Sequence, residues 1–420
     1  MKPLRVGFIP LSDCAVLAVA QEKGFFRRHE IEVTLSREVS WANVRDKVAT
    51  GDLDAAQMLA GMPLAATAGI DPFAEPMVTG LSLGLNGNAI TVSTSLWARM
   101  QEADADSVMR RPASAVALRR VIDDDRRQRR PMLRFAMVYP FSTHNYELRY
   151  WLAAAGIDPD NDVRLSVVPP IRMVEMLGRV AVDGFCVGEP WSSLAVSRGL
   201  GRIVATKYDI WNNSPEKVLA VKRRFAEQNP EVHRALLRAV LDAARWADLP
   251  ENRGEVARIL AAEAYIGVPE PVLAATLDGR VVLARDEAPV SIPDFHVFHR
   301  YGANVPWISH ALWLLVQMLR WGQLTSAPNL MKLARSVYRV DLYRAAALEL
   351  GVSAPDADLK SEGVHGGPWS LPGTAGPVEM GPDLFFDGRE FHPTELASYL
   401  MSLQGNLPQR SFEALLEANS

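Results

Sequence analysis

The sequence predicts an α/β fold with two open lobes, a cleft between them, a hinge made of two crossing segments, and a helical C-terminal extension. The first observation is size: 420 residues, of which 48% are hydrophobic, are enough for two or three packed domains. The second is an internal echo between residues 7–14 and residues 136–144, in which an apolar strand runs into Pro, then Ser, then a helix. Such a repeat places a helix N-terminus beside the carboxyl end of a strand, where backbone N–H groups can hold a small anion.

The first lobe is predicted from strand and helix patterns that alternate from the N-terminus. Strands are expected at residues 4–9, 31–35 and 54–58, and helices at 14–23 and 41–50, with another helix opening at Met62. Gly24 and Gly51 follow the first two helices, as is typical of helix ends. This order is that of a βαβαβ unit, the building block of an open α/β sheet.

The pattern restarts after a charged stretch and predicts a second lobe. Strands are expected at residues 133–138, 163–168 and 183–187, and helices at 144–155 and 171–180. Residues 85–94 and 202–207 are interpreted as two strands that cross between the lobes, which would make a hinge. Lobe I is therefore expected to comprise residues 1–90 and 208–420, and lobe II residues 91–207.

The chain after residue 210 is predicted to be mostly helical. Helices are expected at residues 231–246, 252–263, 271–277 and 307–321. Residues 351–382 are crowded with Gly, Pro, Ser and Asp, which predicts a long irregular loop that is either mobile or laid across the body. A turn at Asp387-Gly388 and a final helix from Pro393 should follow.

Composition and charge exclude several classes of protein. The formal net charge is −4, so we expect no direct contact with nucleic acid and none with a membrane. The two cysteines, Cys14 and Cys186, are interpreted as small buried side chains rather than as a disulfide or a zinc site. The first residues run straight into a strand, with no signal segment ahead of it, which leads us to expect a cytoplasmic protein unless the chain is a trimmed export form.

Several polar residues follow predicted strands or open predicted helices, where a cleft between the lobes would lie. They are Ser12, Asp13, Trp41, Gln57, Asn88, His144, Glu189 and Lys217. Each has a plain structural alternative: His144 as a packed surface-turn histidine, Lys217 as a solvated charge, and Trp41 as a core residue. On position, His144 is best interpreted as a donor at a helix start, since no second His or Cys near it has metal-ligand spacing.

Catalysis is disfavoured. Glu189 and Lys217 could form an acid–base pair, but no phosphate loop, nucleophile elbow or dinucleotide fingerprint accompanies them, and Glu189 more plausibly caps a helix. We therefore expect a binding protein without a cofactor or metal. The arginines of residues 110–130 are interpreted first as a solvated helix face and, as an alternative, as a docking surface for a protein or RNA partner.

Long motifs in this chain resemble the nitrate- and bicarbonate-binding proteins of ABC transporters. The motifs are residues 7–15, 22–26, 36–47, 144–154, 187–191, 215–219, 299–301 and 307–313, and they cover most of the chain. The resemblance implies a periplasmic-binding-protein fold of type II that clamps a small planar oxyanion between its lobes. It also implies that Trp41, Asn88, His144, Gly188 and Lys217 line the site, and we expect Glu189, next to Gly188, to be a ligand-binding residue as well.

The resemblance also bears on the ion. Bicarbonate-binding relatives have acidic groups and calcium near the position of Lys217, so a lysine there favours nitrate or nitrite. With no export signal expected, the chain most resembles the cytoplasmic nitrate/nitrite sensors, which bind and release a response-regulator-like, RNA-binding antiterminator that controls nitrate assimilation genes. One alternative is an exported receptor of a nitrate ABC transporter. Another is a binder or enzyme for a small organic ligand such as a sulfonate or a thiamine precursor.

Overall fold

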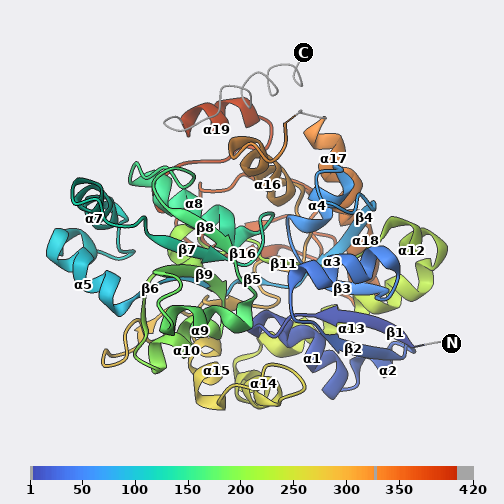
Figure 1. Ribbon diagram of the computed structural model, residues 1–420. Coiled ribbons are helices and arrows are strands. Elements are labelled where there is room, and N and C mark those ends of the chain that lie inside the picture. The colour runs from blue at the N-terminus through green and yellow to red at the C-terminus, as the bar shows by residue number, and fades with distance from the viewer. Residues whose placement is uncertain (1–2, 326–328, 404–420) are drawn as a thin grey trace.

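The computed structural model describes residues 3–325 and 329–403 and contains two five-stranded sheets, each flanked by helices (Figure 1). One sheet has the strand order β2-β1-β3-β11-β4 and the other the order β10-β6-β9-β7-β8. Each sheet mixes parallel pairs of strands with antiparallel ones: β11 runs antiparallel to β3 in the first sheet, and β6 runs antiparallel to β9 in the second. The predicted fold class, an α/β protein with two lobes and C-terminal helices, is confirmed.

The first lobe is built on the sheet that contains the N-terminal strand. Its strands are β1 (Leu4–Phe8), β2 (Val33–Arg37), β3 (Ala55–Leu59), β4 (Met77–Ser82) and β11 (Lys217–Lys222). Its helices are η1 (Ser12–Cys14), α1 (Ala15–Glu22), α2 (Phe25–Arg28), α3 (Trp41–Thr50), α4 (Met62–Thr67), α12 (Arg223–Gln228), α13 (Pro230–Asp248) and α18 (Val340–Glu349). Strand β11 lies antiparallel between β3 and β4 and is buried along its whole length, so its first residue, Lys217, points into the protein's interior region rather than to solvent.

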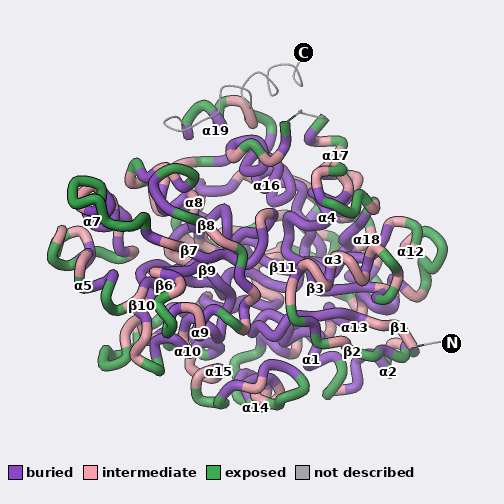
Figure 2. Tube along the Cα trace, viewed as in Figure 1, coloured by how far each residue is buried: buried purple, intermediate pink, exposed green. Residues whose placement is uncertain are grey.

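The second lobe repeats this plan. Its strands are β6 (Asn88–Ser93), β7 (Arg134–Met137), β8 (Arg164–Val167), β9 (Gly184–Gly188) and β10 (Gly201–Thr206). Its helices are α5 (Thr94–Ala103), α6 (Ala105–Val108), α7 (Val116–Arg127), α8 (Thr143–Ala154), η2 (Pro170–Arg172), α9 (Met173–Gly178), α10 (Trp191–Ser197) and α11 (Lys207–Ile210). Burial is densest along the strands and on the helix faces that cover them, while the outer loops are exposed (Figure 2).

The connections between the lobes differ from those predicted. The expected crossing strand at 85–94 is divided into β5 (Leu85–Asn86) and β6 by Gly87, whose φ of 85° breaks the extended conformation. Residues 202–207 are not a crossing, because β10 pairs antiparallel with β6 inside the second sheet. The return runs instead through residues 211–216, where Asn86 Nδ2 donates to Asn213 Oδ1 (3.1 Å) and so ties the two connections together.

The C-terminal extension is largely helical, as predicted. Its helices are η3 (Pro250–Asn252), α14 (Arg253–Ala261), α15 (Glu270–Leu277), α16 (Ile308–Arg320), α17 (Leu330–Val337) and α19 (Leu396–Ser402). Its short strands are β12 (Arg280–Val281), β13 (Val290–Ser291), β14 (His296–Val297), β15 (Trp369–Leu371) and β16 (Val378–Met380). Residues 351–382 lie across the body and contain the β15–β16 hairpin, and the last helix begins at Leu396 rather than at Pro393.

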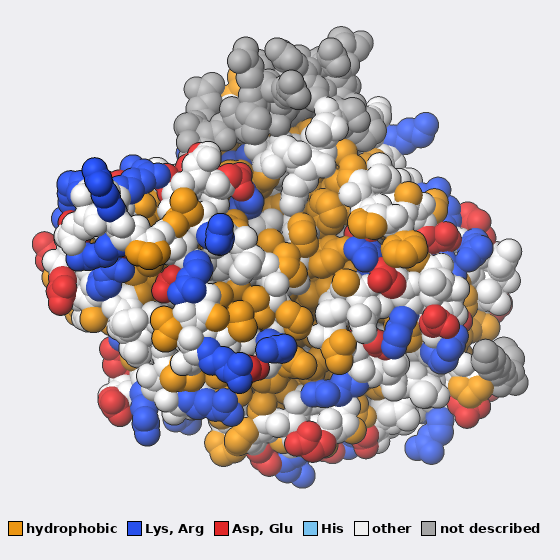
Figure 3. Space-filling view, in the orientation of Figure 1, with side chains coloured by type: hydrophobic (Ala, Val, Ile, Leu, Met, Phe, Trp, Pro, Cys, Tyr) orange, Lys and Arg blue, Asp and Glu red, His pale blue; other side chains and the backbone are white. Residues whose placement is uncertain are grey.

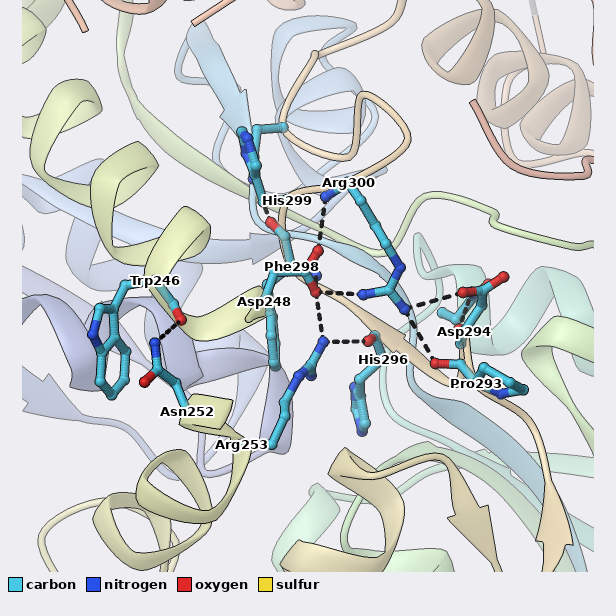
Figure 4. A network of polar contacts seen from close by, with 12 residues as sticks. Trp246, Asp248, Asn252, Arg253, Pro293, Asp294, His296, Phe298, His299 and Arg300 are labelled. Carbon is cyan, nitrogen blue, oxygen red and sulfur yellow. Dashed lines mark hydrogen bonds and ion pairs between the residues drawn. The ribbon is translucent and has the colours of Figure 1, made fainter. Parts of the chain in front are cut away.

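A buried network of ion pairs and hydrogen bonds stabilises the segments that connect the two lobes (Figure 4). Asp248, at the end of α13, accepts hydrogen bonds from Arg253 Nη2 (2.5 Å) and Arg300 Nη1 (2.8 Å). Arg253 also donates to the carbonyl of His296 in β14 (3.0 Å), and β14 pairs with β5. The network therefore stabilises β14, the strand that pairs with β5 in the first of the two connections between the lobes.

Candidate functional site

The structure brings five of the residues implied by the resemblance into one buried region between the two sheets. Asn88, the first residue of β6, pairs in register with Gly188, the last residue of β9. The Lys217 ammonium lies 5.5 Å from the centroid of the Trp41 ring, and His144 Nε2 lies 3.6 Å from the Glu216 carboxylate, next to Lys217 in the chain. The side chains of Trp41, Asn88, His144 and Lys217 are at most 1% exposed.

Local sequence explains how these side chains are positioned. Trp41 opens α3 because Ser40 caps that helix, its Oγ accepting from the backbone N–H of Asn43 (3.2 Å). His144 lies in the first turn of α8, which Ser142 caps in the same way through the N–H of Asn145 (3.0 Å). A helix start from each lobe thus faces the region between the sheets.

Lys217 is held by two carboxylates. Its Nζ lies 2.7 Å from Asp13 Oδ2 and pairs with Glu216 Oε1. Asp13 Oδ1 accepts from Gln57 Nε2 (2.5 Å), and Gln57 Oε1 accepts in turn from the backbone N–H of Ile9 (2.9 Å). Burial raises the pKa of Asp13 in spite of the lysine beside it.

Glu216 lies at the centre of a buried charged region formed by Asp13, Glu147, Lys207, Glu216 and Lys217. Its Oε2 accepts from Asn88 Nδ2 (2.6 Å) and from the Thr143 hydroxyl, and lies 3.0 Å from Lys207 Nζ. Burial acts to raise the pKa of Glu216, but the ammonium groups of Lys217 and Lys207 outweigh it and hold the pKa well below its usual range. Glu216 is therefore a carboxylate at neutral pH.

Sequence reasoning missed three of these charged residues: Glu147, Lys207 and Glu216. Lys207 pairs with Glu147 of α8 as well as with Glu216, and all three are at most 3% exposed. The sequence held no signal for Glu147, because charged residues are usually exposed, and only the structure shows that α8 is buried on nearly every side, so that Glu147 needs a partner inside.

His144 is a neutral imidazole in this setting. Burial lowers its pKa to about 3, outweighing the Glu216 carboxylate, which acts to raise it, while Lys217 and Lys207 act in the same direction as burial. Neither ring nitrogen has a hydrogen-bond partner among the described residues. A neutral imidazole offers one N–H donor and one acceptor, so the ring is equipped to bind a ligand through its N–H.

Other buried polar atoms of the region also lack a partner among the described residues. They are Ser12 Oγ, Trp41 Nε1, Asn88 Oδ1, Glu189 Oε1, Ser192 Oγ and Ser214 Oγ. A buried polar group without a hydrogen bond is costly, and a group of them in one region indicates a place for water or a polar ligand.

Glu189 occupies a different position from the others. Its Oε2 accepts from the N–H of Ser193 in the first turn of α10 (3.1 Å), in agreement with the helix-capping interpretation. Its backbone carbonyl accepts from the N–H of Ser12 in the other lobe (2.7 Å), and burial raises the pKa of its carboxyl to about 7. Glu189 thus lies where the lobes touch, without a direct contact to Lys217.

The two lobes are closed over this region. Trp191 Nε1 donates to the carbonyl of Pro10 (3.1 Å), which adds to the contact between Ser12 and Glu189. Nearer the surface, Arg45 of α3 donates to the Tyr139 hydroxyl (2.9 Å), which donates to Asp71 (2.8 Å). Hydrophobic side chains fill the middle of the face between the lobes (Figure 3).

The arginine-rich stretch lies far from this region, on α7 and the segments around it. Its apolar side, with Leu118 and Ile122, is buried, while Arg127 is exposed and Arg119 and Arg126 both pair with Asp162. Lys and Arg side chains gather at this edge of the molecule (Figure 3). Cys14 and Cys186 are both buried and free, as predicted.

Two further observations concern the described residues as a whole. Within residues 3–325 and 329–403, no helix has the length and apolar character needed to cross a membrane. Over the same ranges, His, Cys, Asp and Glu side chains do not gather in threes as the ligands of a metal ion would.

Comparison with known protein sequences gives three relationships. The model of the NMT1-like family matches residues 1–261. The "Nitrate import ATP-binding protein NrtC" of Synechocystis sp. PCC 6803 is 39% identical over 83% of this chain and 50% of that protein, so the chain spans about half the length of this relative. The "Nitrate/nitrite binding protein NrtA" of Nostoc sp. PCC 7120 is 31% identical over 95% of this chain and 85% of that protein.

Among solved structures, the periplasmic nitrate-binding protein NrtA from Synechocystis PCC 6803 superimposes with a TM-score of 0.84 at 29% identity. The match covers 96% of this chain and 99% of that one. The agreement therefore extends over both lobes and the C-terminal extension.

Proposed function

Because the chain belongs to the NMT1-like family, and within it to the nitrate- and bicarbonate-binding proteins, we propose that it binds nitrate or nitrite between its lobes. The observation that carries this proposal is the set of buried donors beside Lys217 that have no hydrogen-bond partner within residues 3–325 and 329–403: the indole N–H of Trp41 and the neutral ring of His144. A weakly hydrated monoanion needs a few N–H donors and one positive charge, and a flat aromatic face suits its planar shape.

The proposal is tested by titration calorimetry with nitrate, nitrite, bicarbonate and a small alkanesulfonate. Nitrate or nitrite should bind, and Lys217→Ala should remove most of the affinity while far-UV circular dichroism stays unchanged. Lys332→Ala, which removes an exposed lysine on α17, is the matched control and should bind as the unaltered protein does. Binding of the sulfonate alone would favour the organic-ligand alternative.

We propose further that the binding protein serves an ABC transporter as its receptor for the anion. The names of its relatives support this role, since they refer to nitrate import and to nitrate/nitrite binding. Closure of the lobes around the ion would present one surface to the transporter and the open form another.

The second candidate is the cytoplasmic sensor expected from the sequence, in which the same closure releases an RNA-binding antiterminator. Contacts such as that of Ser12 with Glu189 support it, because an anion that stabilises them changes the outer surface that a partner meets. A pull-down from nitrate-free lysate, repeated with nitrate, separates the roles. A response-regulator-like protein that dissociates on adding nitrate supports sensing, and membrane transporter subunits support transport.

A further inference from the structure

The buried charges around Lys217 do not balance. Three carboxylates, those of Asp13, Glu147 and Glu216, face two ammonium groups, those of Lys207 and Lys217. The most exposed of the five residues, Asp13, is only 8% exposed. With every carboxylate ionised and His144 neutral, these groups sum to one negative charge before any anion arrives.

A bound nitrate would double that buried negative charge. Like charges that share a poorly solvated site cannot all stay ionised, and the usual outcome is that one carboxylate takes up a proton. The alternative, breaking the Lys217 pairs so that the lysine faces the anion alone, would leave Asp13 and Glu216 buried with fewer partners and is costly for the same reason.

We propose that the anion enters this charged region together with one proton, which the carboxylate of Glu147 receives. This inference rests on the proposed function and adds a second ligand to the same site. The proton comes from water or buffer and forms one O–H bond on Glu147, and no other bond changes. The complex then has the same net charge as the free site.

Hydrogen-bond donors distinguish Glu147 from the other two carboxylates that pair with the lysines; Glu189, the fourth buried carboxyl of the region, pairs with neither lysine and accepts from the Ser193 N–H at the lobe contact. Glu216 has donors or ammonium groups on both oxygens, and Asp13 has Lys217 on one oxygen and Gln57 on the other. Glu147 accepts from Lys207 on Oε1, while its Oε2 is buried without a hydrogen-bond partner among the described residues. The Asn88 amide lies close enough to act against the rise of the Glu147 pKa, but its hydrogen bond goes to Glu216 (2.6 Å). Protonation of Glu147 therefore sacrifices the fewest bonds, and Lys207 keeps its pair with Glu216.

The groups packed around Glu147 agree with this assignment. They come from four parts of the fold: Lys207 of α11, Glu216 before β11, Asn88 of β6 and the Cys186 thiol of β9. Burial raises the pKa of Glu147 to about 7, with Lys207 acting against that rise and Glu216 adding to it. A nearby anion would raise this pKa further.

The direction of the pH dependence follows. Below about pH 7, Glu147 already holds its proton before the anion binds, so the affinity is constant. Above that pH the free protein has lost the proton and must regain it on binding. The dissociation constant then rises by up to about tenfold per pH unit until the pKa of the complex is reached.

The test is calorimetry of the full chain with sodium nitrate, and in parallel with sodium nitrite, at about pH 6 and about pH 8.5 in buffers of different ionisation enthalpy. Neither anion titrates in this interval, so the dependence of the heat on the buffer counts protons taken up by the protein. We expect nearly one proton at the higher pH and almost none at the lower. Glu147→Gln, which is neutral at every pH, should abolish the uptake and make the affinity independent of pH.

Glu362→Gln is the matched control, because it removes a buried carboxylate that pairs with Lys360 and His310 and with neither Lys207 nor Lys217, and its proton uptake on nitrate binding should equal that of the unaltered protein. A heat independent of the buffer at both pH values overturns the inference, and needs no variant. Uptake that persists in Glu147→Gln overturns it as well. No binding of either anion at any pH overturns the proposed function, a result distinct from binding without a proton.

Discussion

At the scale of single residues, a substitution of Trp41 tests whether its indole N–H donates a hydrogen bond to the anion or whether its ring only contacts the anion. Its indole N–H is buried and has no partner among the described residues, so Trp41→Phe removes no protein hydrogen bond and retains an aromatic face. If the N–H donates to the anion, the dissociation constant should rise about tenfold or more, the effect of losing a hydrogen bond to a charged group. Titration calorimetry with nitrate measures it.

Trp211→Phe is the matched control for that substitution. Trp211 is buried, its Nε1 also has no partner in the described part of the chain, and its ring stacks on Phe385 rather than on Lys217. Its replacement should leave nitrate affinity unchanged. Equal nitrate affinities of Trp41→Phe and Trp211→Phe would mean that the Trp41 ring contacts the anion without donating a hydrogen bond to it.

The residues found from the sequence and those missed differ in a physical respect. Trp41, His144 and Lys217 could be found because each opens a helix or a strand, and such ends collect at the edge of a sheet. Glu147 and Lys207 could not, since charged residues are usually exposed and only the distant pairing of α8 with α11 makes these two buried partners. Pairing across 60 positions of sequence is set by tertiary structure alone.

At the scale of elements, the helix starts at Ser12 and Ser142, which are similar in sequence, differ in their capping. Ser142 caps α8, whereas Ser12 makes no capping bond and its hydroxyl has no partner among the described residues. Ser142→Ala should therefore lower the free energy of unfolding by about 1 kcal/mol, the usual contribution of a helix cap. Urea unfolding without nitrate measures it, and Ser12→Ala, which removes no such bond, should unfold nearly as the unaltered protein does.

A substitution of Asp248 tests how much its buried ion pairs contribute to the free energy of unfolding. Asp248→Ala leaves the Arg253 guanidinium buried beside α13 without its carboxylate, which should reduce the free energy of unfolding by about 3–5 kcal/mol. Asp286→Ala removes an exposed carboxylate and should have almost no effect. Urea denaturation at neutral pH compares the two, and equal midpoints would contradict a role for the network in stability.

Acid should act on the same network. Burial acts to raise the pKa of Asp248, but Arg300 and Arg253 lower it below its ordinary value. A carboxyl with a depressed folded pKa stabilises the protein fully above its unfolded pKa, near 4, and loses that contribution as the pH falls through the folded pKa. Unfolding free energies measured from about pH 5 downward should therefore converge for Asp248→Ala and the unaltered protein.

The order of elements could be predicted, but their connections could not. Alternating periodicity located the strands and helices of both lobes because each pattern is local. The division of the expected crossing strand depends on positive φ values at Asn86 and Gly87, and the bond between Asn86 and Asn213 forms only once both connections lie side by side. The path of the chain after residue 351 depends on contacts with residues far away in the sequence, such as the stacking of Phe385 on Trp211.

For the whole molecule, closure depends on contacts that each lobe supplies in part. The backbone contact of Ser12 with Glu189 closes the buried side, and Tyr139 closes the outer side by linking Arg45 and Asp71 of the first lobe to the second. The C-terminal extension touches both lobes: the Tyr338 hydroxyl donates to the carbonyl of Ala60 in the first lobe (2.8 Å), and the Tyr150 hydroxyl of α8 donates to Asp387 of the extension (3.0 Å). The extension can therefore bias the equilibrium between open and closed forms.

Tyr139→Phe tests closure directly, because it removes the hydroxyl that bridges the lobes and leaves Arg45 paired with Asp71 within the first lobe (3.3 Å). The hydroxyl accepts from Arg45 and donates to Asp71, so two hydrogen bonds of about 1 kcal/mol each are lost. Nitrate binding should weaken about thirtyfold, mainly through faster dissociation, since the contact exists only after closure. Stopped-flow tryptophan fluorescence measures both rates. Tyr208→Phe, which removes a hydroxyl outside this contact, should change neither rate, and an unaltered dissociation rate in Tyr139→Phe would show that the outer contact does not hold the lobes closed.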